Sequence, residues 1–165
     1  MLTLFFHPFS SYCQKVLIAL YENGTAFERR ILGPDDPAAM DELRAMWPIG
    51  KFPLLMDDGA PVIEASVIIE HLGLRHPGPV ALLLADPVAA LKVRVWDRFF
   101  DNYVATPQQA IVLDALRPDG KRDPEGVRIA RQALDAAYAY LDGRMADRDW
   151  VAGDSFSLAD CAAAP

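Results

Sequence analysis

Short apolar runs and helical spacings alternate along the first part of the chain. Residues 2–6 are apolar and end at His7-Pro8, which predicts a short buried strand. Over residues 11–23 the apolar positions recur every three or four residues and Gly24 follows, which predicts a helix. Residues 27–32 are predicted as a second strand. A strand, a helix and a strand within about 30 residues form a βαβ unit.

A second helix and a hairpin are predicted next. Asp36-Pro37 is a cap residue followed by proline, which starts a helix that reaches about Met46. Two prolines and a glycine make residues 47–53 an irregular loop. Residues 54–56 and 61–63 are predicted as short strands around the turn Asp58-Gly59. A helix is expected over residues 64–75.

The pattern of strands stops at Pro77-Gly78-Pro79. We therefore predict an α/β domain over residues 1–76, a linker over 77–86 and an all-helical domain over 87–165. Asp86-Pro87 and Asp123-Pro124 start long helices in the second domain. Pro107 is expected to bend or end the first of them.

The first long helix carries an apolar stripe along one side. Its apolar members are Val88, Leu91, Val95, Phe99 and Tyr103, and the polar Asn102 lies on the same stripe. Such spacing places the side chains on one helical face.

The last helix begins at a clear cap. Ser157-Leu158-Ala159-Asp160 has the form of a capping box with Asp in the place of Glu. Only a few apolar residues follow before Pro165. We therefore expect that this helix is incomplete and that the second domain is truncated.

Composition narrows the class of protein. The net charge of −7 argues against nucleic acid and against a polybasic membrane anchor as partners. The N-terminus lacks the features of a signal peptide, and no apolar stretch approaches the length of a membrane span. Cys13 and Cys161 are the two cysteines, too far apart in sequence for a disulfide scaffold or a visible metal cluster. We expect a reducing, cytoplasmic compartment.

Four segments in order resemble a known family. They are residues 6–16, Gly50-Lys51-Phe52-Pro53, residues 64–72 and residues 153–160. Together they are similar to the cytosolic glutathione S-transferases of bacterial type, over the whole chain. The resemblance implies a thioredoxin-like domain, with a four-stranded mixed sheet and flanking helices, followed by a helical bundle. It also implies a homodimer that uses glutathione as co-substrate, without a metal.

Ser10 is the candidate for thiol activation. Free thiols titrate near pH 8.5, so an enzyme must stabilise the thiolate. Ser10 lies where the first helix begins, and it offers a hydroxyl donor next to unpaired N–H groups. Ser11 is the alternative. Ser10 to Cys13 also resembles the Cys-x-x-Cys motif of glutaredoxins with the first thiol removed, which favours transfer over dithiol exchange. Cys13 is expected to pack in the core.

The resemblance assigns further residues to glutathione. Pro53 matches the family's cis-proline, with the backbone of Phe52 beside the cysteinyl part and Lys51 near the glycyl carboxylate. Glu64 and the start of the following helix match the site of the γ-glutamyl group. The family has Glu-Ser there, whereas Ala65 follows Glu64 and Ser66 comes one place later. The backbone N–H of Ala65 survives this change, and Ser66 is a possible substitute for the hydroxyl.

The remaining candidates concern the electrophile and the charged groups. The candidates for the electrophile pocket are Phe9, Phe99, Tyr103 and Thr106, although an aromatic stripe at helical spacing more often packs in the core. Asp101 is either a contact to glutathione across a dimer or, the favoured reading, a solvated side chain. His7, His71 and His76 show no partner pattern and are assigned to surface or helix positions.

The sequence thus predicts a glutathione transferase that conjugates a small electrophile. A glutathione-dependent isomerase of the maleylacetoacetate type is the enzymatic alternative. A non-catalytic interaction module and a glutaredoxin-like redox protein are the alternatives from other classes.

Overall fold

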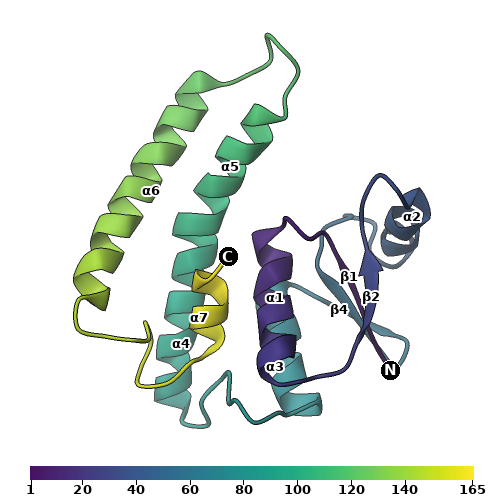
Figure 1. Ribbon diagram of the computed structural model, residues 1–165, viewed down its shortest axis with the longest axis vertical. Helices are drawn as coiled ribbons and strands as arrows, with labels where there is room; N and C mark the ends of the chain where they lie inside the picture. Colours follow the sequence, from purple (N-terminus) through teal and green to yellow (C-terminus); the bar gives the residue numbers. More distant parts are fainter.

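The computed structural model describes residues 1–165 and contains one four-stranded mixed sheet (Figure 1). The strand order is β2-β1-β3-β4. β1 is parallel to β2 and antiparallel to β3, and β3 is antiparallel to β4. The strands are β1 (Leu2–Phe6), β2 (Glu28–Ile31), β3 (Leu54–Asp57) and β4 (Ala60–Ile63).

Helices cover both faces of the sheet. α1 (Ser11–Glu22) and α3 (Ala65–Arg75) lie on one face, and α2 (Pro37–Met46) lies on the other (Figure 1). Successive side chains of a strand point to opposite faces, so β1 supplies both cores. Leu4 packs with α1 and α3, whereas Phe5 packs with Leu43 of α2.

The second half of the chain is helical. Its elements are α4 (Pro87–Phe99), the π-helix η1 (Phe100–Ala105), α5 (Thr106–Ala115), α6 (Pro124–Met145) and α7 (Leu158–Ala163). No strand or helix is present between the end of α3 and the start of α4. The predicted fold class, a mixed four-stranded sheet with helices followed by a helical region, is confirmed. No helix meets the length and apolarity that a membrane crossing requires.

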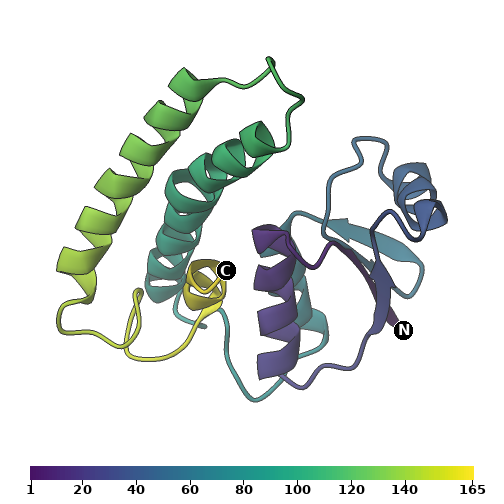
Figure 2. The same cartoon turned by 45° about the horizontal axis from the view of Figure 1, so that its top comes forward.

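One hydrophobic core joins the two halves. Val16 of α1 and Ile68 of α3 belong to the same buried cluster as Val93 of α4 and Leu158 of α7. Figure 2 shows α7 lying between α4 and α1. The predicted capping box of α7 is present, because the Asp160 carboxylate accepts hydrogen bonds from the backbone N–H (2.9 Å) and the hydroxyl (2.8 Å) of Ser157. This short helix therefore helps to fix the helical half against the sheet half.

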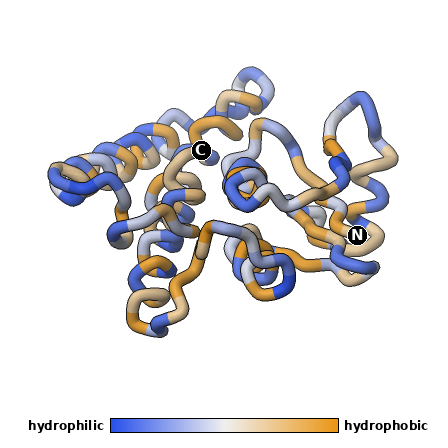
Figure 3. Tube along the Cα trace, turned by 60° about the horizontal axis from the view of Figure 1, so that its bottom comes forward, coloured by the Kyte–Doolittle hydropathy of each residue, from blue (hydrophilic) through white to orange (hydrophobic).

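The predicted apolar stripe of the first long helix enters the core only at Phe99, which packs against the main cluster. Val88 is 66% exposed, Leu91 60% and Val95 57%. The buried residues of α4 are instead Ala90, Val93, Trp96 and Asp97. Figure 3 shows hydrophobic and hydrophilic residues alternating along the helices of this half. α4 is therefore apolar on two sides, and one of them faces outward.

Pro107 interrupts the long helix as expected, but the change begins earlier. The α-helix stops at Phe99, six residues of π-helix follow, and α-helix resumes at Thr106. Proline has no N–H to donate to the preceding turn, which a wider turn accommodates. The wider turn contains Asp101, which lies in the site described next.

Candidate functional site

A pocket of about 350 Å³ opens between the sheet half and the helical half. Its size falls within the range of small-molecule sites. Six of its lining residues are those that the sequence assigns to glutathione, namely Lys51, Phe52, Pro53, Glu64, Ala65 and Ser66. The structure therefore brings together side chains from the loop before β3 and from the start of α3.

The start of α3 presents unpaired N–H groups at this pocket. Glu64 is the N-cap residue, and its side chain makes no capping hydrogen bond. Its φ of 68° lies in the left-handed region, which is unusual for a residue other than glycine. Such strain is concentrated at ligand sites. The peptide bond between Phe52 and Pro53 is cis, as predicted from the resemblance.

A buried lysine lies behind the pocket. Lys15 of α1 is 1% exposed, and its Nζ is 3.0 Å from both carboxylate oxygens of Asp101. Lys15 also forms an ion pair with Asp97 and donates to the hydroxyl of Ser66 at 2.9 Å. Arg98 pairs with both aspartates from the solvent side. These five side chains, which we call the Lys15 network, connect α1, α3, α4 and η1.

Asp101 is therefore not a solvated aspartate, and the favoured sequence reading was wrong. Asp101 is only 7% exposed, and its carboxylate lies against Lys15. Burial raises the pKa of the Asp101 carboxyl, against the opposing attraction of Lys15. The burial of Lys15 was not predicted, because lysine is rarely buried unless it is paired and its partners here lie far away in sequence. A usable signal was present, since Asp97 and Asp101 are four residues apart, close to the buried stripe of the long helix.

Ser66 belongs to the same network, which changes its expected role. Its hydroxyl donates to the Asp97 carboxylate at 2.8 Å and accepts from Lys15. The hydroxyl proton is thus already engaged within the protein. A ligand at the start of α3 would meet the backbone N–H of Ser66 rather than its hydroxyl.

The two candidate serines face different surroundings. Ser10 is the N-cap of α1, and its Oγ accepts a long hydrogen bond of 3.4 Å from the N–H of Cys13. Capping uses the oxygen as an acceptor, so the hydroxyl proton stays available for a donor bond. Ser11 lines a separate hollow of about 180 Å³ with Phe100, Val104 and other apolar residues of the helical half.

The two thiols are buried and poorly suited to redox chemistry. Burial raises the pKa of Cys13 to about 11, and burial together with the nearby Asp160 raises the pKa of Cys161 to about 12. Both side chains are 0% exposed. The thiolate is the reactive species, so neither residue is prepared to act as a nucleophile.

We expect both cysteines to resist alkylation in the folded chain. At pH 8 a thiol of pKa about 11 is ionised in only about one molecule in a thousand. Iodoacetamide labelling followed by mass spectrometry should show modification at least 100-fold slower than in the chain unfolded in denaturant. Rapid labelling of Cys13 in the native chain would contradict this description.

The residues predicted for the electrophile are dispersed. Phe9 is 89% exposed, and Thr106 donates to the backbone oxygen of Asp101 at 2.8 Å. Phe99 packs against Tyr103 and Tyr140, with ring centroids 5.4 Å and 5.7 Å away. None of Phe9, Phe99, Tyr103 and Thr106 lines either hollow described above. Their assignment stays a prediction.

Several pocket residues were not anticipated from the sequence. They are Tyr12, Trp47, Ile63, Arg98, Asn102 and Gln109. Tyr12 follows the serines directly, and its hydroxyl donates to the backbone oxygen of Asp101 at 3.3 Å. Only the helical spacing in α1 would have indicated that Tyr12 turns toward this side.

His71 lies in α3 and His76 at its end, in line with the predicted helix positions, but the sequence did not reveal their shared partner. His71 and His76 both place Nε2 at 2.8 Å from the same oxygen of Asp57. Asp57 ends β3, so these three residues meet only in the folded chain. His7 lies apart from them, with its ring stacked at 6.1 Å on Phe52.

Family models match both halves of the chain. The model of the glutathione S-transferase N-terminal domain matches residues 4–80, and that of the C-terminal domain matches residues 85–165. The chain belongs to the glutathione S-transferase family.

Individual glutathione S-transferases support this assignment. Glutathione S-transferase GstB of Escherichia coli is 28% identical over 169 residues, an alignment that covers 100% of this chain and 81% of the relative. A glutathione S-transferase of Methylobacillus flagellatus, solved with glutathione bound, superimposes with a TM-score of 0.88 at 28% identity and covers 98% of this chain and 79% of that one.

A second solved structure agrees. The glutathione S-transferase of Methylobacterium radiotolerans, in complex with glutathione sulfonate, is 32% identical with a TM-score of 0.81. The comparison covers 98% of this chain and 75% of that chain. Glutathione S-transferases from three bacteria thus resemble this chain over nearly its entire length.

Proposed function

We propose that this protein binds glutathione in the pocket beside α3, holds it as the thiolate with Ser10, and transfers it to a small electrophile. The observation that carries the proposal is the convergence of six residues assigned to glutathione on one pocket of about 350 Å³. The relatives solved with glutathione and glutathione sulfonate support the choice of ligand.

The charges around the pocket suit the two ends of glutathione. The unpaired N–H groups at the start of α3 would receive the γ-glutamyl carboxylate, with Glu64 near the α-amino group. Lys51, which is exposed at the pocket, would meet the glycyl carboxylate. The cysteinyl part would then lie along Phe52, between these two anchoring regions.

Ser10 is assigned to the thiol because its hydroxyl proton is available and it caps α1. The positive end of the α1 dipole and a hydrogen bond to sulfur both favour the thiolate. A hydrogen bond to a charged group contributes about 1.5–3 kcal/mol, which corresponds to a thiol pKa lowered by about one to two units. Glutathione would then be substantially ionised near neutral pH.

The exposed stripe of α4 supports a homodimer. Val88, Leu91 and Val95 form an apolar strip on the outside of this helix. Apolar side chains gathered on an exposed surface are typical of protein interfaces. We therefore propose that two copies of the chain associate through this face of α4.

Calorimetric titration tests the binding site. We expect the chain to bind glutathione with one site per chain, and to bind cysteinylglycine at least 10-fold more weakly, because the dipeptide lacks the group that would occupy the start of α3. Absence of heat with glutathione, from a chain whose circular dichroism shows it folded, would overturn the proposal. Equal affinity for the two ligands would place the γ-glutamyl group elsewhere.

A further inference from the structure

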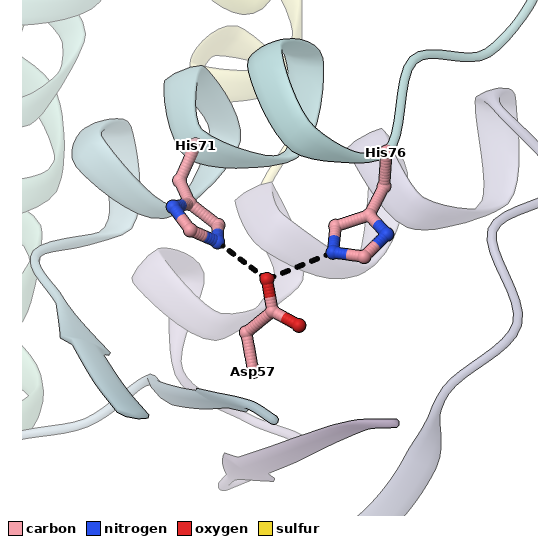
Figure 4. A group of neighbouring side chains, drawn as sticks. All are labelled: Asp57, His71 and His76. Atoms are coloured by element: carbon pink, nitrogen blue, oxygen red, sulfur yellow. Dashed lines mark hydrogen bonds and ion pairs between the residues drawn. The ribbon is translucent and has the colours of Figure 1, made fainter. Parts of the chain in front are cut away.

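Asp57, His71 and His76 form a cluster between the end of β3 and the C-terminal half of α3 (Figure 4). The pocket residue Pro53 precedes β3, whereas Asp57 ends it. Ser66 is in the first turn of α3, and His76 follows the helix ten residues later, about 15 Å along its axis. The cluster is therefore separate from the pocket.

We propose that these three side chains form a binding site for a divalent transition-metal ion such as zinc. The three offered ligand atoms lie within 4.8 Å of one another. Imidazole nitrogens and a carboxylate oxygen are a donor set that zinc accepts, with a water in the fourth position.

Metal binding requires small side-chain rotations and, because each Nε2–H donates to the carboxylate, a shift of each imidazole proton to Nδ1. Both imidazole Nε2 atoms are 2.8 Å from Oδ2 of Asp57, and Figure 4 shows the two rings converging on that oxygen from α3 and its end. In a tetrahedral zinc site with bonds of about 2.0–2.1 Å, neighbouring ligand atoms are about 3.3 Å apart. Small rotations of the side chains would thus place all three donors around one ion.

The orientation and exposure of the cluster also suit a metal. The Asp57 carboxylate already accepts from both imidazoles, so its oxygen is directed at the point where the two rings meet. The Asp57 side chain is 8% exposed, while those of His71 and His76 are 26% and 33% exposed. The carboxylate is held in place by the fold, and the imidazoles leave a path for the ion and its water.

Competing ligands within the chain are weak. Cys13 and Cys161 are buried, and burial raises the pKa of both thiols to about 11 and about 12. A bound ion would tie the end of α3 to the turn between β3 and β4. It would stabilise the folded chain by linkage, since the unfolded chain does not hold the three donors together.

The test uses the full chain, without a histidine tag and without glutathione, which itself binds zinc. Calorimetry with zinc chloride at pH 7.5 should show one ion per chain. At a zinc concentration about 100 times the Kd, linkage should raise Tm by about 5–10 °C. Cobalt substitution should give the visible spectrum of a four-coordinate nitrogen and oxygen site.

His76→Gln is the decisive variant. Glutamine retains an N–H donor for Asp57, so the Tm of the metal-free chain should change little while zinc affinity falls at least 10-fold. His7→Gln is the matched control and should retain one zinc ion. Asp57→Asn removes a second proposed ligand and should also weaken zinc binding. No stoichiometric zinc binding by the wild type, or affinity unchanged in both His76→Gln and Asp57→Asn, would overturn the proposal.

Discussion

Replacing Ser10 with alanine should abolish most conjugation while leaving glutathione binding nearly intact. Loss of the hydroxyl removes the proposed hydrogen bond to sulfur, so the bound thiol should return toward its free pKa near 8.5. At pH 7 the thiolate fraction would then fall, and we expect kcat with a chlorodinitrobenzene substrate to fall roughly 10- to 30-fold. The affinity for glutathione should change less than about 3-fold, because the anchoring contacts lie at α3 and Lys51.

Ser10 also caps α1, so stability must be separated from chemistry. Loss of an N-cap costs about 0.5–2 kcal/mol. Ser10→Asp restores a capping acceptor but places a negative charge beside the thiolate, so it should be stable and inactive. Ser11→Ala distinguishes the two serines. If Ser11→Ala loses conjugation while Ser10→Ala retains it, the thiol is activated by Ser11.

Replacing Lys15 with methionine should destabilise the protein more than any surface substitution. Methionine fills a similar volume, but it leaves Asp97 and Asp101 without their buried cation and with only the solvent-facing Arg98 as a partner. Removing one partner of a buried ion pair typically costs about 3–5 kcal/mol. Urea unfolding of the variant should show a lower midpoint with a similar slope.

Lys92→Met is the matched control for this substitution. Lys92 lies exposed on α4, so its replacement should change the free energy of unfolding by less than about 0.5 kcal/mol. The triple variant Lys15→Met, Asp97→Asn, Asp101→Asn should recover part of the loss, because no unpaired charge is left buried. Equal stability of Lys15→Met and the wild type would contradict the role of the Lys15 network.

Local sequence signals were sufficient to predict most helices and strands of the fold. Asp-Pro pairs mark the starts of α2, α4 and α6, and the structure shows a side-chain cap at Asp36, Asp86 and Asp123. The turn Asp58-Gly59 joins β3 and β4 as expected. These signals succeed because caps and tight turns depend on residues within a few positions of one another.

Signals that depend on distant packing were missed or misjudged. The buried side of α4 was missed because the helix has two apolar sides, and only contact with the distant α7 selects one of them. Lys15 lies 82 positions from Asp97 and Asp57 lies 19 positions from His76, so neither cluster shows in a local pattern. The glutathione residues were found through family motifs, whereas Arg98 lies outside those motifs and Tyr12, although within residues 6–16, was given no role.

The pKa of bound glutathione tests the central claim most directly. The ultraviolet absorbance of the thiolate, followed as pH is raised on the complex of glutathione with the chain, reports ionisation of that sulfur alone when the chain without ligand is subtracted. We predict a thiol pKa of about 6.5–7.5 in the wild type and an increase of about one to two units in Ser10→Ala. A bound thiol that titrates near 8.5 in both proteins would contradict thiolate activation by this chain.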